Sequence, residues 1–231
     1  MSTNPGGGAE LGRLSFRLRP AGGEGGPRDE HLGLGDERDG WLYVPETAEA
    51  GAPLLVFLHG ATGTGHSHGR AVLGAADRFG VVVVAPDSRH GQTWDLIATR
   101  AFGPDVAYLD RVLDAVVDRV DVDTDRLAVG GVSDGASYAL SIGLSNGDVF
   151  GTVLAFSPGF LAVAEPNDRP RVFVSHGRSD PILPFETCSG TIVPMLRRAD
   201  YEVELELFDG GHTVPPEVAD TGVRWWLALP A

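Results

Sequence analysis

The sequence predicts an α/β domain with a mostly parallel central sheet and helices on both of its faces. Several strand candidates are apolar along their whole length, as in the run VVVV at 81–84, which is typical of strands covered on both sides. Helical patterns separate most of these strands, and such alternation favours parallel strands joined by crossover helices. A chain of 231 residues is long enough to bury one sizeable core. We therefore expect a single domain over residues 41–231.

We expect residues 1–40 to form a separate segment of loop with one edge strand. Residues 5–39 are rich in glycine and charge, and the alternating stretch LSFRL at 14–18 is the edge-strand candidate. Seven strand candidates follow: WLYVP (41–45), LLVFLHG (54–60), VVVVAPDS (81–88), RLAVGGVS (126–133), GTVLAFSPG (151–159), RVFVSHG (171–177) and VELELFDGG (203–211). The chain shows no internal repeat and no linker between domains.

The clearest helical pattern is DVAYLDRVLDAVVDRV at 105–120, where apolar residues recur every three or four positions. It predicts a crossover helix. Four further segments have helical patterns: GRAVLGAADRFG (69–80), SYALSIGLSNG (137–147), GTIVPMLRRAD (190–200) and PEVADTGVRWWLAL (216–229).

The composition argues against several classes of partner. Lys and Arg total 18 against 32 Asp and Glu, so the formal net charge of −14 repels nucleic acids and anionic membrane surfaces. No apolar run is long enough to insert into a membrane. The single cysteine, Cys188, lies in no pattern of zinc ligands, and the N-terminus lacks a basic and apolar signal segment. We expect a cytoplasmic protein without metal or cofactor; the oligomeric state, a homodimer included, stays open.

The stretch GGVSDGA at 130–136 directly follows an apolar strand candidate and precedes a helical pattern. Three structures compete for it: a flexible loop, a phosphate cradle, or a sharp turn that presents Ser133. A phosphate cradle of the P-loop type needs a lysine, which this stretch lacks. The pattern GxSxG instead fits a tight strand-to-helix turn in which Gly131 and Gly135 leave room for close neighbours. On this reading Ser133 is a nucleophile.

A serine hydroxyl needs a histidine base that a carboxylate orients. In a turn of this kind the partners follow in the order serine, acid, histidine, each after a later strand. Asp180 follows the strand candidate at 171–177 and His212 follows the next one, so these two residues are the predicted partners. Asp209 and Glu217 are alternative acids, although Asp209 lies close to His212 along the same loop.

Two backbone N–H groups are expected to stabilise the oxyanion: that of Ala61, in the loop HGATGTG, and that of Asp134, after the nucleophile. The Asp134 carboxylate must then point away, as an acid at a helix N-terminus. The glycines of this loop leave plain flexibility as the alternative.

The other histidines have simpler interpretations. His59 and His176 precede glycines at strand ends and are expected to shape loops. His66 and His68, in GHSHG, resemble a metal-binding pair, but no carboxylate or cysteine cluster accompanies them. His31 and His90 are expected at the surface, with a place for His90 at the mouth of the site left open.

With these motifs in place, the chain from Trp41 onward resembles the α/β-hydrolase superfamily. It is most similar to the bacterial carboxylesterase/phospholipase group, including polyhydroxybutyrate-depolymerase-like and feruloyl-type esterases. The resemblance implies an α/β-hydrolase fold with the triad Ser133, Asp180 and His212 and the oxyanion donors Ala61 and Asp134. Dienelactone hydrolases of similar size use a cysteine nucleophile, whereas position 133 is serine, and Cys188 lies on the wrong segment to replace it.

The resemblance also implies a hydrolase of carboxylic esters. Caps in this fold commonly follow the strand that ends here in FSPG, yet only about a dozen residues separate Gly159 from Arg171, so we expect an open groove for short or medium acyl chains. The candidates for its acyl-binding wall are Trp94, Phe156, Phe160, Ile182 and Leu183, each of which could equally pack beneath loops. The alternatives for function are a thioesterase or lysophospholipase using the same triad and, in another class, a non-catalytic binding protein.

Overall fold

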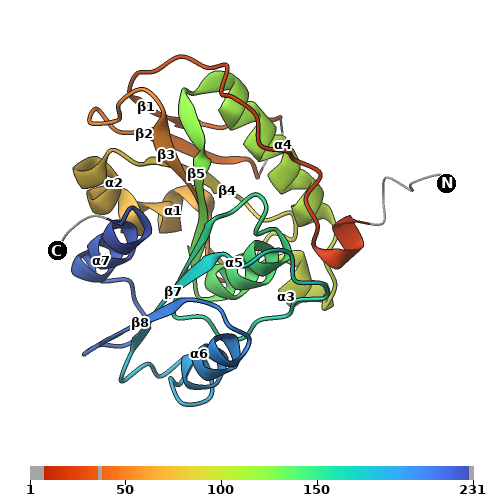
Figure 1. Ribbon diagram of the computed structural model, residues 1–231, viewed down its shortest axis with the longest axis vertical. Helices are drawn as coiled ribbons and strands as arrows, with labels where there is room; N and C mark the ends of the chain where they lie inside the picture. The colour runs from red at the N-terminus through yellow and green to blue at the C-terminus, as the bar shows by residue number, and fades with distance from the viewer. Residues whose placement is uncertain (1–7, 36–37, 229–231) are drawn as a thin grey trace.

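The computed structural model describes residues 8–35 and 38–228. Its centre is an eight-stranded sheet of order β1-β2-β4-β3-β5-β6-β7-β8 (Figure 1). The pairs β1–β2 and β2–β4 are antiparallel, and all other neighbours run parallel. The strands are β1 (Arg28–His31), β2 (Gly40–Val44), β3 (Ala52–Leu58), β4 (Val82–Pro86), β5 (Val122–Val132), β6 (Thr152–Phe156), β7 (Arg171–Gly177) and β8 (Val203–Phe208).

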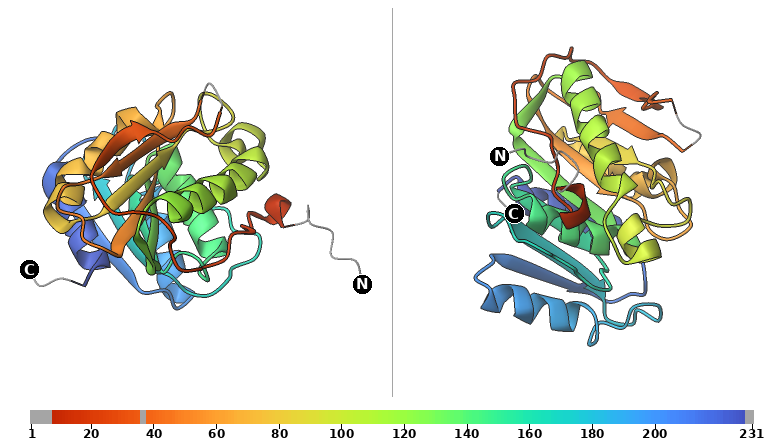
Figure 2. Two further views of the ribbon diagram at one scale, coloured as in Figure 1. Left: turned by 90° about the horizontal axis from the view of Figure 1, so that it is seen from above. Right: turned by 90° about the vertical axis from the view of Figure 1, so that its right-hand side faces the viewer.

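Helices cover both faces of this sheet, as the two views of Figure 2 show. The alternation of side chains along β3 demonstrates the two layers: Leu54, Val56 and Leu58 belong to one buried cluster, and Leu55 and Phe57 to the other. Residues of α4 (Pro104–Arg119), α5 (Asp134–Ser145) and α6 (Ser189–Arg198) join the first cluster. Residues of α2 (Leu73–Phe79) and α7 (Pro216–Trp226) join the second. The predicted α/β fold is therefore confirmed.

The predicted helices are all present, with shifted ends. The pattern at 69–80 becomes α1 (Gly65–Gly69), the 3-10 turn Arg70–Val72 and α2, because Val72 interrupts the regular helix. The long pattern at 105–120 is α4, which starts with Pro104 in its first turn, where a missing N–H costs nothing. One short helix, α3 (Asp95–Thr99), has no counterpart among the sequence predictions.

The predicted edge strand at 14–18 is wrong. This stretch forms no strand and instead runs along α4 as an extended strap, drawn in red in Figure 1. The Asp110 carboxylate of α4 accepts the N–H groups of Ser15 and Phe16, and so takes the place of a neighbouring strand. Leu14 and Phe16 are buried beneath the strap. The edge of the sheet next to β2 is formed by β1 instead.

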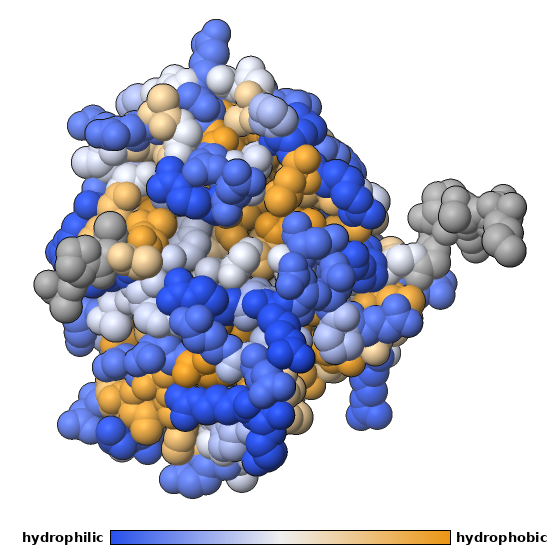
Figure 3. Space-filling view, in the orientation of Figure 1, coloured by the Kyte–Doolittle hydropathy of each residue, from blue (hydrophilic) through white to orange (hydrophobic). Residues whose placement is uncertain are grey.

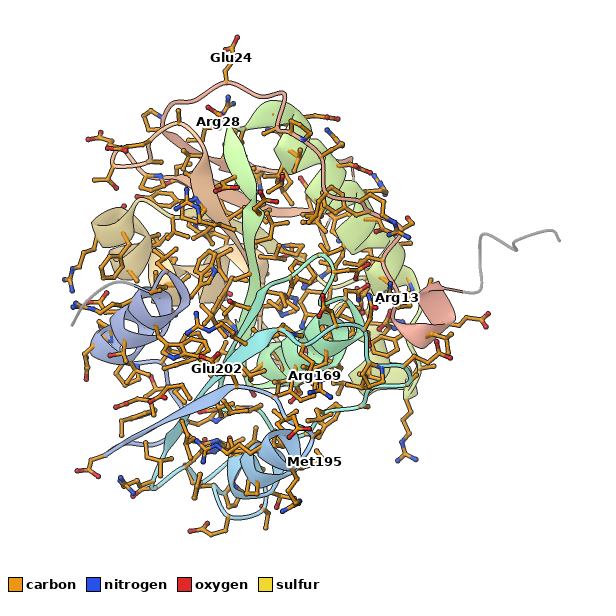
Figure 4. The ribbon with its side chains drawn as sticks, in the orientation of Figure 1. Arg13, Glu24, Arg28, Arg169, Met195 and Glu202 are labelled. Atoms are coloured by element: carbon orange, nitrogen blue, oxygen red, sulfur yellow. The ribbon has the colours of Figure 1, made fainter. Side chains whose placement is uncertain are left out.

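Ion pairs and polar side chains fix the start of the strap and cover much of the surface. Arg13, labelled in Figure 4, lies 3.3 Å from the Asp148 carboxylate.

In Figure 3 hydrophilic residues alternate with smaller apolar patches. Four large apolar side chains of the described residues are exposed: Leu18, Phe160, Ile182 and Met195, the last of which stands on α6 in Figure 4. None of the helices in the described ranges is long and apolar enough to span a membrane.

Candidate active site

Ser133 lies at a strained turn between β5 and α5. Its backbone has φ 59° and ψ −120°, a conformation that L-residues adopt only when their surroundings enforce it. The Ser133 N–H donates to the carbonyl of Phe156, and its own carbonyl accepts the N–H of Ser137. These bonds tie the turn to β6 and to α5, so it is a rigid corner and not a flexible loop.

The two glycines of the GxSxG pattern are required by close approach. A Cβ on Gly135 would lie 2.1 Å from the carbonyl oxygen of Leu58 on β3, and a Cβ on Gly131 would lie 2.6 Å from the backbone of Gly135. Neither atom could fit without moving a backbone. The spacing in the sequence thus reports the contact of α5 with β3, and this contact sets the angle of the corner.

The structure brings Asp180 and His212 together. The His212 Nδ1–H donates to Asp180 Oδ2 at 2.6 Å, which leaves Nε2 of the ring as the proton acceptor. The other carboxylate oxygen accepts the N–H groups of Ile182 and Leu183, both at 2.9 Å. The Asp180 side chain is fully buried and that of His212 is 18% exposed. The acid therefore accepts three hydrogen bonds, and the imidazole reaches solvent.

The charge of Asp180 is stabilised where it lies. Burial by itself would raise the pKa of this carboxyl, but the N–H of Leu183, the His212 ring and the N–H of Ile182 outweigh it and bring the pKa below its usual value. The two alternative acids lie elsewhere: Asp209 is 3.5 Å from Arg178 with its side chain 96% exposed, and Glu217 is exposed on α7. Asp180 is the carboxylate that meets His212.

Ser133 and His212 line one pocket of about 400 Å³. Its wall combines backbone of the loop after β3, a polar stretch of α1 and the segment after His212. The lining residues are Gly60, Ala61, Ser67, His68, Ala71, Val132, Ser133, Ile182, His212, Thr213 and Val214. Among them, Thr213 and Val214 had no sequence signal beyond directly following His212, and Ala71 and Val132 had none.

Of the two predicted oxyanion donors, Ala61 lines this pocket, and Asp134 directly follows Ser133, which also lines it. No hydrogen bond to the Ala61 N–H occurs within the described parts of the chain. Asp134 is the first residue of α5, where an N–H has no partner within the helix. Its carboxylate accepts the Thr93 hydroxyl at 2.6 Å, and this bond holds it on the loop that precedes α3.

Two of the five residues predicted for an acyl-binding wall do not reach the pocket. Trp94 is fully buried, stacks on Tyr138 and donates its indole N–H to the carbonyl of His59. Phe156 is fully buried in β6 between Phe57 and Phe173. Both predictions are wrong because these rings complete the core under the loops.

The other three candidates lie on loops around the site, but one alone lines the pocket. Ile182 does so and is 65% exposed. Phe160 is 37% exposed, and the carbonyl of Leu183 accepts a hydrogen bond from the His176 ring. Neither residue is part of the pocket lining given above. The chain between β6 and β7, residues 157–170, contains no helix or strand, so no cap is inserted there, as expected.

Most of the remaining histidines take part in packing or in hydrogen bonds to their neighbours. His176 is buried between the Ser189 hydroxyl and the Leu183 carbonyl, and His59 bonds backbone groups on both ring nitrogens. His66 meets Trp41 edge-on, whereas His68 lines the pocket, so the two rings do not form a pair. The described residues contain no group of three or more side chains suited to a metal.

His31, His90 and Cys188 lie away from the reacting groups. His31 and His90 are exposed and neither lines the pocket. Cys188 is buried at the start of α6.

Comparison with known proteins agrees with this architecture. "Probable feruloyl esterase C" of Aspergillus flavus is 27% identical over 161 residues, which cover 65% of this chain and 58% of that protein. Acetylxylan esterase A of Emericella nidulans is 23% identical over 124 residues, covering 51% of this chain and 41% of the relative. The chain thus spans 58% of the length of the first of these curated relatives and 41% of the second.

Solved structures share the fold at lower identity. A carboxylesterase of Bacillus cereus has a TM-score of 0.65 at 17% identity, covering 84% of this chain and 95% of that one. An S-formylglutathione hydrolase of Staphylococcus aureus has a TM-score of 0.69 at 15% identity, covering 92% and 100%. Residues 40–187 match the sequence pattern of the family described as Esterase PHB depolymerase. With the α/β-hydrolase fold and the serine corner at its pocket, this chain belongs to the Esterase PHB depolymerase family.

Proposed function

We propose that this protein is a serine hydrolase of carboxylic esters, in which Ser133, His212 and Asp180 act as nucleophile, base and orienting acid. The observation that carries the proposal is the hydrogen-bonded Asp180–His212 pair, whose imidazole lines the same pocket as the strained Ser133. Family membership and the names of the relatives support it.

The chemistry follows from the protonation of these groups. His212 keeps its proton on Nδ1, which donates a hydrogen bond to Asp180. Its Nε2 is therefore free to accept the proton of Ser133 Oγ as that oxygen attacks the ester carbonyl. The negative charge that forms on the carbonyl oxygen is stabilised by the N–H groups of Ala61 and Asp134. His212 then returns the proton to the departing alcohol, and water repeats the sequence to release the acid. The buried Asp180 stabilises the imidazolium in both halves.

Pocket and charge favour uncharged esters of short to medium acyl chains. The pocket of about 400 Å³ has no cap inserted at residues 157–170, and its lining combines small residues with Val132, Ile182, Val214 and two histidines. The net charge of −14 repels the phosphates of acyl-CoA and lysophospholipids. The names of the relatives add feruloyl esters and acetylxylan to the substrates worth testing.

The single buried thiol suits a reducing compartment, so we propose a cytoplasmic location, which cell fractionation tests.

The direct test is the Ser133→Ala variant with p-nitrophenyl acetate and butyrate. We expect loss of at least about 10³-fold in kcat, with an unchanged circular dichroism spectrum and melting temperature, because the substitution keeps the Cβ and removes only the hydroxyl. A fluorophosphonate probe should label the wild type and not the variant. A panel of methyl ferulate, p-nitrophenyl esters of increasing chain length, an acyl-CoA and a lysophospholipid then separates ester from thioester and phospholipid hydrolysis. Failure of Ser133 to label would favour a non-catalytic binding protein.

A further inference from the structure

Gly60 joins β3 to the loop that carries Ala61, at a point where an added Cβ would be tightly packed. A Cβ there would lie 3.1 Å from the Cβ of Ser133 and 3.2 Å from the carbonyl oxygen of Val132. Glycine is also the residue with the greatest backbone freedom. An oxyanion donor, however, is effective only when its N–H is already aimed before the reaction. The peptide groups on either side of Gly60 must therefore be held by something other than a side chain at this position.

Hydrogen bonds hold those two peptide groups at three of their four polar ends. In the first group, the His59 carbonyl accepts the indole N–H of Trp94, and the Gly60 N–H donates to His68 Nδ1, both at 2.8 Å. In the second, the Gly60 carbonyl accepts Nδ1–H of His59 at 2.8 Å. The fourth end is the N–H of Ala61. In a planar trans peptide this N–H points opposite to the Gly60 carbonyl, so the bonds that hold Gly60 also aim Ala61.

His68 is the member of this set that comes from outside the core and the loop. It lies on α1, whose start is fixed by the capping box of Thr64 and Ser67 and by the bond from Gly65 N–H to Asp87. Its ring packs on Gly63, where a Cβ would lie 2.5 Å from Cε1. The Gly60–His68 contact thus joins the capped helix α1 to a glycine of the loop that carries Ala61.

The contact also decides the tautomer of His68. A backbone N–H can only donate, so Nδ1 must carry the lone pair, and Nε2 carries the proton. Burial lowers the pKa of His68, which keeps this ring neutral. His59 has the opposite tautomer, because its Nδ1–H donates to the Gly60 carbonyl and its Nε2 accepts the Ser88 N–H. Gly60 therefore lies between a ring that accepts and a ring that donates.

We propose that His68 is a positioning residue for the oxyanion hole: as a neutral imidazole with its proton on Nε2, it fixes the Gly60 N–H and thereby the direction of the Ala61 N–H. The inference rests on the proposed function and extends it to a residue that no triad includes. It predicts that the Nδ1 lone pair of His68 matters for transition-state stabilisation more than for substrate binding.

Two variants separate the lone pair from the ring. His68→Phe keeps a ring of similar size but offers no acceptor, whereas His68→Asn places a carbonyl oxygen near the position of Nδ1 and cannot titrate. The matched control is His66→Asn, an exposed neighbour on the same helix that lies outside the pocket. Each variant is first compared with the wild type by circular dichroism and thermal unfolding.

We expect His68→Phe to lower kcat for p-nitrophenyl butyrate by on the order of ten- to a hundred-fold with KM nearly unchanged, less than loss of an oxyanion donor itself. Its affinity for phenylboronic acid, whose tetrahedral adduct occupies the oxyanion hole, should fall by a similar factor. His68→Asn should recover most of both losses, and His66→Asn should match the wild type. In the wild type, ¹⁵N NMR of the imidazoles should show His68 protonated on Nε2.

The proposal is overturned if folded His68→Phe keeps kcat and boronate affinity within about twofold of the wild type, or if KM alone changes. It is equally overturned if His68 carries its proton on Nδ1, a result that needs no variant to fold. Activity that persists in Ser133→Ala would instead refute the proposed function, so the two failures are distinguishable.

Discussion

The Asp180→Asn substitution tests whether the protonation pattern of the site is essential. One oxygen of Asp180 accepts two backbone N–H groups, those of Ile182 and Leu183, which can only donate. Asparagine will keep its carbonyl oxygen on that side, so its amide N–H₂ faces His212 Nδ1. An amide can only donate there, and the ring must offer a lone pair. The proton of His212 then moves to Nε2, the nitrogen that should accept the proton of Ser133.

The size of the effect follows from the cost of the reverse arrangement. Activity requires the asparagine to turn its carbonyl toward His212, which leaves the two N–H groups facing an N–H₂. Each buried donor without a partner costs about 1–3 kcal/mol, so the active orientation lies about 2–6 kcal/mol above the inactive one. At about 1.4 kcal/mol per factor of ten, kcat should fall by roughly thirty-fold to 10⁴-fold. KM should change little, because the Asp180 side chain is fully buried.

The assay is initial-rate kinetics on p-nitrophenyl butyrate, with thermal unfolding to establish that the variant is folded. Asp209→Asn is the matched control, since this residue lies in the loop before His212 with its side chain 96% exposed, and it should keep wild-type kcat. An Asp180→Asn variant that retains more than about a third of wild-type kcat would refute the reasoning, because the cost worked out above would then be absent. A loss in Asp209→Asn instead would return that residue to the role of acid.

Three further predictions concern the scaffold. Gly135→Ala should destabilise the fold by several kcal/mol, on the order of a severe core mutation, because its Cβ would lie 2.1 Å from the Leu58 carbonyl. Gly74→Ala, on the exposed side of α2 where an added Cβ meets nothing within 4 Å, should instead raise the free energy of unfolding by about 0.4–1 kcal/mol. Urea titration measures both variants. A Gly135→Ala variant as stable as the wild type would contradict the packing argument. Burial raises the pKa of Asp105 from 3.8 to about 6, so the protonated acid is favoured in the folded state. The stabilisation by protonated Asp105 is complete below about pH 4, is lost as the pH rises through about 6, and amounts to at most about 3 kcal/mol. In urea titrations from pH 4 to 7, Asp105→Asn should lack this part of the pH dependence. An identical pH dependence in wild type and variant would assign the effect to another group.

The sequence alone predicted the parts of the molecule that depend on local chemistry. A strand that turns abruptly into a helix needs glycines two positions before and two positions after the residue at the turn. The spacing of Gly131 and Gly135 therefore predicted the sharp turn at Ser133. Parallel strands end at one edge of a sheet, and this rule placed Asp180 and His212 near each other although 32 positions separate them. Alternation of apolar runs with helical patterns was enough for the fold class.

Contacts between distant segments were decided only by the tertiary structure. Residues 14–18 alternate as an edge strand does, but the carboxylate of Asp110 accepts the N–H groups of Ser15 and Phe16 and a strap results. Trp94 lies in a loop whose sequence would suit a substrate wall, yet it is buried with its indole N–H on His59. The sequence argued against a metal pair at His66 and His68 but gave no other role for His68, and only the structure shows that its ring accepts the Gly60 N–H. Periodicity and spacing record what a residue requires of its chain neighbours, whereas burial and hydrogen-bond partners depend on which remote groups the folded backbone brings within a few ångströms.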